Sequence, residues 1–213
     1  VTTGPKQPRF RPGVAVAIIR DCLSALAALH RNRIVHGDIK PGNIMLKRTG
    51  HVKIIDTGSA FEMDTPPEQR GCTPSYAAPE ALEGKEITPL SDLASIGYVL
   101  IELLAGQAPF AGISTYRELL KAKRLLPKQL DSILPEEITT NPMLMSFCRR
   151  LVAWDPKQRF ASAEAAELLD EGAADYHRQL VLSNDAIEYS NEIRMWLEEL
   201  HELEENRTSD FTI

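Results

Sequence analysis

The chain has 213 residues, of which 43% are hydrophobic and 25% charged, and its net charge is −6 at pH 7. This composition predicts one globular domain with its own core and room for an appendage. The acidic balance argues against a general nucleic-acid or acidic-lipid surface, because phosphate backbones recruit basic patches. We therefore expect neither a nucleic-acid partner nor a membrane partner.

The cysteines and the hydropathy of the chain point to a reduced compartment. Cys22, Cys72 and Cys148 are odd in number and form no C-x-x-C pair, so neither a disulfide framework nor a zinc site is expected. The most apolar run, residues 93–106, is too short to span a bilayer, which needs about 20 apolar residues. No cleavable signal pattern is visible. A cytoplasmic location is predicted.

The first part of the chain reads as a lead-in, a helix and a hairpin. Glycine and proline make residues 1–13 irregular. Apolar residues at steps of three and four then predict an amphipathic helix over residues 14–30. Two short apolar runs, residues 43–47 and 52–55, flank a turn at Gly50 and predict a hairpin. This hairpin would set the side chains at its two ends close enough to reach one metal ion.

The middle of the chain is organised around an apolar helix. Residues 57–80 lack periodicity and contain four prolines, which predicts a long functional loop. Residues 90–105 are apolar nearly all round, which is typical of a helix buried on every side. Gly106 follows where a helix-ending glycine belongs. Further helices are expected at residues 114–124, 142–153 and 162–176.

The tail predicts one more helix over residues 180–206. Its apolar positions recur at steps of four and three, and Asp185, Glu192 and Glu199 flank them, a pattern suited to a helical partner. The tail is short for a coiled coil, which is identified firmly only over at least about 3 to 4 heptads. Packing on its own domain is therefore favoured over a homodimer through residues 180–206, and both alternatives stay open.

A polar constellation lies between the first helix and the hairpin, and continues past it. Asp38, Lys40 and Asn43 stand in the sequence His-Gly-Asp-Ile-Lys-Pro-Gly-Asn, and Asp56 follows the hairpin. Such a set can perform phosphoryl transfer. One carboxylate receives or orients a hydroxyl proton, the lysine neutralises a phosphate, and the amide and second carboxylate hold magnesium.

The order of these residues resembles the protein kinase catalytic loop, H-R-D-x-K-x-x-N, followed by D-F-G. Residues 78–80 match the A-P-E motif that ends the activation segment, and residues 71–76 match the substrate-receiving segment before it. Asp155-Pro156 followed by Arg159 resembles a late element of the same family. The matches are collinear from about residue 14 to 172. The chain is therefore similar to the carboxy-terminal lobe of a serine/threonine protein kinase.

The resemblance implies a role for each matching residue. Asp38 would be the catalytic base, Lys40 a phosphate contact, and Asn43 and Asp56 the magnesium ligands. Thr73 would lie in the substrate segment and, with Lys40, looks like the serine/threonine variant of the family.

Four further residues would be structural rather than catalytic. His36 is expected to be a packing and hydrogen-bonding core residue. Asp92 would lie on the central helix under the catalytic loop, and Arg159 would pair with Glu80.

The fold implied is mainly α. It is a kinase-like carboxy-terminal lobe, with a helical bundle around a buried central helix, a small hairpin at the catalytic loop and an extra C-terminal helix. The expected boundaries are a lead-in at 1–13, the lobe at 14–176, and a C-terminal extension and tail at 177–213.

Three departures from the family pattern bear on function. Gly37 replaces an arginine that receives the phosphate of a phosphorylated activation loop. Thr57 replaces an aromatic residue that helps to set the active arrangement. Only 35 residues precede His36, with no Gly-rich loop and no strand-borne lysine. We therefore expect the amino-terminal lobe to be absent from this chain.

Two functions follow. The first is the carboxy-terminal lobe of a serine/threonine kinase, which in the intact protein transfers phosphate from Mg-ATP to a protein hydroxyl. Mg²⁺ and ATP are then the expected cofactors, with a protein substrate and a separate amino-terminal-lobe chain as partners. The isolated chain would be inactive and would bind neither cofactor tightly. The alternative is a non-catalytic, pseudokinase-like module that binds a partner protein as a scaffold.

Overall fold

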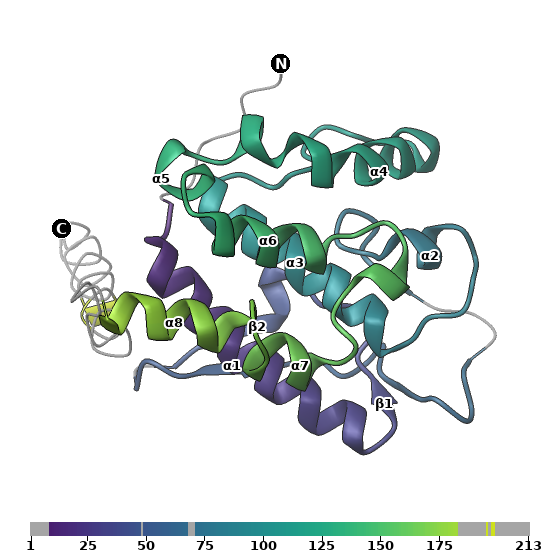
Figure 1. Ribbon diagram of the computed structural model, residues 1–213. Coiled ribbons are helices and arrows are strands. Elements are labelled where there is room, and N and C mark those ends of the chain that lie inside the picture. The colour runs from purple at the N-terminus through teal and green to yellow at the C-terminus, as the bar shows by residue number, and fades with distance from the viewer. Residues whose placement is uncertain (1–8, 48, 68–70, 183–194, 196, 199–213) are drawn as a thin grey trace, which may run out of the picture.

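The computed structural model describes residues 9–47, 49–67, 71–182, 195, 197 and 198. It is mainly helical, with two small antiparallel sheets (Figure 1). The described helices are α1 (Pro12–Arg31), α2 (Pro79–Leu82), α3 (Pro89–Ala105), α4 (Tyr116–Ile133), α5 (Glu136–Thr139), α6 (Pro142–Leu151), α7 (Ala163–Leu168) and α8 (Ala173–Leu182). The strands are β1 (Ile34–Val35), β2 (Ile44–Leu46), β3 (Val52–Ile54) and β4 (Phe61–Glu62), and short 3-10 turns lie at Pro41–Asn43 and Pro156–Gln158. The predicted fold class is confirmed.

Helix α3 is the centre of the molecule and lies between α1 and α6 (Figure 1). Every residue from Ser91 to Ile101 is buried. Thr88 begins the helix, because its hydroxyl accepts a hydrogen bond from the backbone N–H of Leu90 while the Ser91 hydroxyl accepts one from Thr88. Gly106 ends it at φ +70°. The prediction of a buried helix at 90–105 is confirmed for residues 91–101, whereas Leu90, Glu102, Leu103 and Ala105 are half-buried.

Helix α1 is long and apolar enough to cross a membrane by length and composition alone. Its 18-residue apolar window is 56% buried within the fold, however. The buried face, which includes Ile19, Leu23 and Leu26, packs against α3, α7 and α8. This burial accounts for its apolar character as a core helix.

The two sheets position the polar loop between α1 and β2. Strands β2 and β3 form the predicted hairpin, with Met45 opposite Lys53 and Gly50 at φ +81° in the turn. Strand β1 pairs with β4, so that Val35 lies opposite Phe61. The sequence did not predict this second sheet, because each of its strands has only two residues and no periodicity can register in so short a run.

Helix α4 extends nine residues beyond the predicted end at Arg124. Pro127 lies inside it and removes one backbone donor. The helix continues because Leu126 and Leu130 extend the buried face begun by Leu119. Burial of this face outweighs the local cost of the proline.

The helix predicted at 162–176 is two helices, α7 and α8, so this prediction was wrong. The chain reverses between them, with Glu171 at φ +61°. A Cβ atom on Gly172 would lie 2.7 Å from the carbonyl oxygens of both Ala166 and Leu169. The tight turn therefore requires glycine, and the apolar periodicity alone could not reveal it.

The tail is described only in part. Residues 180–182 belong to α8, and Leu197 is half-buried against the core. Met195 is 65% exposed. The remainder of the helix predicted over 180–206, and with it the choice between docking and dimerisation, lies outside the described residues.

A close approach between α3 and α6 generates the first prediction. A Cβ atom on Gly97 would lie 2.7 Å from Val152 Cγ1 and 2.8 Å from Leu151 Cβ. Alanine normally stabilises a helix relative to glycine by up to about 1 kcal/mol, but overpacking costs about 1–3 kcal/mol. We expect Gly97→Ala to lower the free energy of unfolding in urea.

The matched control is Gly42→Ala. No atom lies within 4 Å of a Cβ placed on Gly42, so this variant should stay within about 0.5 kcal/mol of the wild type. A Gly97→Ala protein as stable as the wild type would show that the helices have more room than the structure indicates.

Candidate active site

A carboxylate on α3 binds the backbone at the start of the loop that follows β1. Asp92 is 1% exposed, and its Oδ2 and Oδ1 accept hydrogen bonds from the backbone N–H groups of His36 and Gly37, both at 2.9 Å. His30 Nε2, at the end of α1, lies 2.9 Å from Asp92 Oδ2. A buried carboxylate needs such partners. One side chain thus joins α1, α3 and the loop.

Asp38 and Lys40, the two residues predicted to be catalytic, contact each other and Thr73. Lys40 Nζ donates to Asp38 Oδ2 at 2.6 Å and to Thr73 Oγ1 at 3.0 Å. The backbone N–H of Thr73 donates to Asp38 Oδ1 at 2.9 Å. The carboxylate therefore binds both the lysine and residues 71–76, which we call the substrate segment.

The surroundings of Asp38 favour its ionised form. Burial opposes ionisation, but hydrogen bonds from Lys40 and from the backbone and side chain of Thr73 outweigh it, and the pKa of Asp38 lies below its ordinary value. The Asp38 side chain is 12% exposed and that of Lys40 29%. Asp38 is therefore ionised at neutral pH, and its contact with Lys40 remains partly accessible to solvent.

Asn43 and Asp56 lie at adjacent positions at the base of the hairpin. The backbone N–H of Ile55 donates to the Asn43 carbonyl at 2.9 Å. Asn43 Nδ2 donates to the carbonyl of Asp38 at 2.8 Å, which leaves its side-chain oxygen for another partner. Asp56 is exposed, has φ +60°, and accepts from Gly58 N at 3.2 Å.

This donor set fits magnesium. An amide oxygen and a carboxylate are hard ligands, and Mg²⁺ in phosphoryl-transfer sites is held by one or two protein carboxylates together with substrate phosphates. Among the described residues no group of three or more His, Cys, Asp or Glu side chains gathers to hold a metal ion without such phosphates.

The residues predicted to be structural are enclosed. His36 is 0% exposed, and its Nδ1 lies 3.4 Å from the backbone N of Asp38. Arg159 donates to both carboxylate oxygens of Glu80, at 2.7 and 2.9 Å. The predicted Glu80–Arg159 pair is thus confirmed. It ties the end of the activation segment to the turn that precedes α7.

Three residues that the sequence did not single out complete these contacts. His30 contacts Asp92, the Ser91 hydroxyl donates to Glu80 Oε1 at 2.7 Å, and Lys123 Nζ donates to the Ser75 carbonyl at 2.8 Å. His30 ends the first predicted helix and Lys123 sits on an amphipathic one, so their patterns resemble those of ordinary surface residues. Of the three residues, only Lys123 has a recognisable sequence signal, which is its register with the apolar face of α4.

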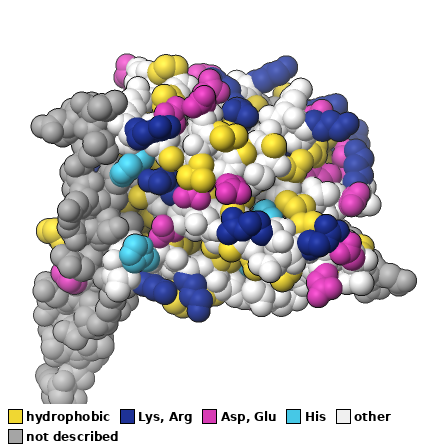
Figure 2. Space-filling model, turned by 60° about the horizontal axis from the view of Figure 1, so that its bottom comes forward, with side chains coloured by type: hydrophobic (Ala, Val, Ile, Leu, Met, Phe, Trp, Pro, Cys, Tyr) yellow, Lys and Arg dark blue, Asp and Glu magenta, His cyan; other side chains and the backbone are white. Residues whose placement is uncertain are grey.

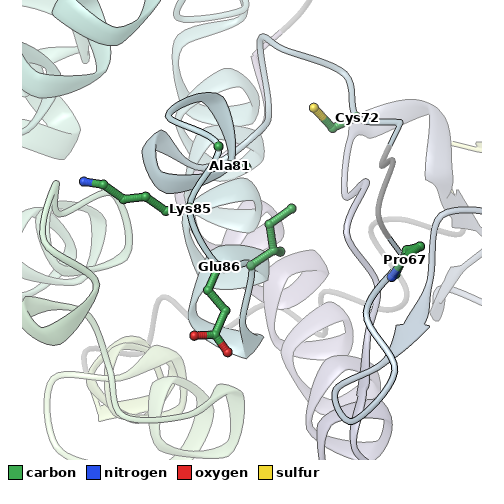
Figure 3. A pocket seen from close by; sticks show the side chains of 7 residues that line it. Pro67, Cys72, Ala81, Lys85 and Glu86 are labelled. Carbon is green, nitrogen blue, oxygen red and sulfur yellow. The ribbon is translucent and has the colours of Figure 1, made fainter.

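A separate hollow of about 410 Å³ adjoins the substrate segment (Figure 3). Pro67 and Cys72 line one side of it, and the connection between α2 and α3 lines the other. Lys85 points to the side opposite Cys72 and pairs with Glu83 at 2.6 Å. Burial raises the pKa of Cys72, so its thiol is not activated. The hollow therefore lacks the charged constellation found at Asp38.

Comparison with known proteins agrees with this geometry. The protein kinase domain family matches residues 4–170. The chain is 31% identical over 159 residues to the serine/threonine-protein kinase PknA of Corynebacterium glutamicum, which covers 73% of this chain and 33% of PknA. It is 33% identical over 166 residues to PrkC of Bacillus subtilis, covering 74% of this chain and 24% of PrkC.

The chain is also similar to a eukaryotic protein kinase. The cAMP-dependent protein kinase catalytic subunit of Schizosaccharomyces pombe is 38% identical over 119 residues, covering 54% of this chain and 23% of that protein. The chain belongs to the protein kinase family, and the relatives PknA and PrkC are serine/threonine-protein kinases. It spans about a quarter to a third of the length of each.

The buried Glu80–Arg159 pair generates the second prediction. The Arg159 side chain is 0% exposed and that of Glu80 8%. Glu80→Gln would leave a buried guanidinium without its counter-charge, which costs about 3–5 kcal/mol. We expect this loss in the free energy of unfolding at pH 7, whereas exposed Glu137→Gln should change it by less than about 0.5 kcal/mol.

The same pair predicts a pH dependence. Burial works against the Glu80 charge, but the hydrogen bonds and charge of Arg159 outweigh it, so the folded-state pKa is lowered. A lowered carboxyl pKa gives stability above the unfolded value, about 4.3, that is lost as pH falls through the folded value. The gap between wild type and Glu80→Gln should therefore narrow below about pH 4. A gap that widens there would contradict the assignment.

Proposed function

We propose that this chain supplies the phosphoacceptor and metal-binding half of a serine/threonine kinase active site. The observation that carries the proposal is the Asp38 carboxylate, bound on one oxygen by Lys40 and on the other by the substrate segment at Thr73. A base and a phosphate-binding cation are thus held against the segment that presents the hydroxyl.

In this proposal each side chain does one task. Asp38, kept ionised, accepts or orients the proton of a serine or threonine hydroxyl that enters beside Thr73. Lys40, which is partly exposed, neutralises the transferred phosphate. Asn43 and Asp56 would hold magnesium, which supplies charge neutralisation to the phosphates when bound.

We propose further that these 213 residues alone do not transfer phosphate. The sequence before His36 contains no G-x-G-x-x-G pattern, and its single lysine, Lys6, stands in Gly-Pro-Lys-Gln-Pro. In kinases a Gly-rich loop and a strand lysine supply half of the nucleotide contacts. Asp56 and Lys40 meet solvent on the side where a nucleotide would lie. Positioning contributes about 7–11 kcal/mol to such reactions, and an open surface cannot provide it.

A scaffold role is the second candidate, and Gly37 favours it. Its φ is +77°, and a Cβ atom there would lie 3.1 Å from the carbonyl oxygen of Ser59. Glycine offers no guanidinium to a phosphorylated activation segment, and a side chain at this position would be strained. Regulation by such a phosphate is therefore not built into this loop, which suits a module that binds without turnover.

The proposal implies a protein substrate, and a chain carrying the amino-terminal lobe as a further partner. On the face shown in Figure 2, acidic and basic side chains are interspersed rather than gathered into one field. The expectation that neither nucleic acid nor a membrane is a partner remains a prediction. The cytoplasmic location remains a prediction.

The test compares the isolated chain with the full-length protein that carries it. Each is titrated with Mg-ATP by calorimetry and assayed for transfer of radiolabelled phosphate to peptides that differ only in a Ser, Thr or Tyr acceptor. We expect transfer to Ser and Thr by the full-length protein, reduced about 10²- to 10⁴-fold by Asp38→Asn. Asp64→Asn, which removes an exposed carboxylate paired with Arg33, is the control and should have little effect.

Three outcomes separate the alternatives. Full-length protein that transfers no phosphate, with wild type and Asp38→Asn alike, favours the scaffold. Transfer by the isolated chain that Asp38→Asn abolishes shows that this lobe suffices. Activity that appears only when a separate amino-terminal-lobe polypeptide is added identifies a split kinase.

A further inference from the structure

A lysine lies buried beneath the substrate segment. Lys123 projects from α4 and is 0% exposed. Its Nζ donates to the backbone carbonyl of Ser75 at 2.8 Å. The same nitrogen lies 3.9 Å from the ring centroid of Tyr98 on α3 and 4.2 Å from that of Phe110.

The desolvation of the Lys123 ammonium group must be offset by favourable contacts, because removing such a group from water is costly. The two aromatic faces and the carbonyl dipole are the partners that offset it. Burial nevertheless lowers the pKa of Lys123 to about 6, with smaller opposing effects from Cys72 and Glu80. A neutral amine still has an N–H to donate, so the bond to Ser75 persists on both sides of neutral pH.

Packing alone does not account for a lysine here. Methionine or leucine would fill the same space without the desolvation cost, and replacing a buried charge by an apolar group of similar volume is often stabilising. What only a donor can provide is the bond to the Ser75 carbonyl. The Lys123 amine is therefore best explained by its hydrogen bond to the segment that contains Ser75.

That segment is anchored at three nearby positions. Thr73 is bound to Asp38 and Lys40 in the catalytic loop. Two residues later the Ser75 carbonyl is bound by Lys123. The hydroxyl of the next residue, Tyr76, donates to Glu102 Oε2 at 2.5 Å.

We propose that Lys123 is a positioning residue, which holds the backbone of Ser75 from below and so keeps Thr73 against Asp38 and Lys40. This inference rests on the proposed kinase function for its catalytic consequence but not for its structural content. Helix α4 thereby becomes part of the substrate site, although its side chains do not touch the Asp38 carboxylate.

The test uses three variants of the full-length protein that carries this chain. Lys123→Met keeps the shape and removes the donor. Lys123→Gln keeps a neutral donor, and Lys121→Met is the control because Lys121 is exposed on the same helix. Amide hydrogen exchange is followed at Tyr76 and Ala77, whose N–H groups bond to the Thr73 carbonyl.

We expect exchange at these two amides to be about fivefold faster or more in Lys123→Met, since the loss of one such bond costs about 1 kcal/mol, which is a factor of about 5. Lys123→Gln should restore most of the protection, and Lys121→Met should match the wild type. In the phosphate-transfer assay, Lys123→Met should raise the KM for the acceptor peptide severalfold and leave the KM for ATP unchanged.

Several results would overturn the proposal. Unchanged exchange in a folded Lys123→Met protein would make Lys123 an ordinary core residue. Equal loss in Lys123→Met and Lys123→Gln, or failure of both to fold, would assign it to stability alone. If the full-length protein transfers no phosphate, the kinase proposal fails, while the exchange results still decide whether Lys123 holds the segment.

Discussion

The described structure depends on one buried carboxylate. Asp92 lies on the buried part of α3, and its carboxylate is tolerable there only because three partners face it: two consecutive backbone N–H groups, which donate to it, and the His30 ring. The two backbone donors are the start of the loop that carries Asp38 and Lys40. The hydrophobic core and the active-site geometry are therefore not separate features. Packing of α3 determines where the carboxylate lies, and the carboxylate determines the course of the loop.

The substrate segment is also positioned by polar contacts with distant parts of the chain. The substrate segment has no regular structure along most of its length, and its position comes from polar contacts made by side chains on other elements. Lys40 reaches it from the catalytic loop, Lys123 from α4 and Glu102 from the end of α3. The Glu80–Arg159 pair then fixes the helical turn that follows. These contacts define the position of the segment, although residues 72–76 are only half-buried.

Much of this could be predicted from the sequence, because local patterns carry it. The buried helix, the hairpin and the order of Asp38, Asn43 and Asp56 follow from apolar spacing, turn residues and motif order. The contacts that were missed join residues far apart in the chain. Lys123 is 48 residues from its partner Ser75, and no periodicity reports such a pair. The reversal between α7 and α8 was missed for a different reason: it depends on a glycine that a steric contact requires, within a run of helix-favouring residues.

The α3 carboxylate organises the loop that carries Asp38 and Lys40, and Asp92→Asn tests this most directly. An amide would present a donor to one of the two backbone N–H groups, leaving that group buried without a partner at a cost of about 1–3 kcal/mol. The measurement is amide hydrogen exchange at residues 36 and 37, with exposed Asp131→Asn as the control. We predict exchange about fivefold faster or more in Asp92→Asn, which is the lower end of that cost, with the control unchanged. Exchange at wild-type rates in a folded Asp92→Asn protein would contradict the claim.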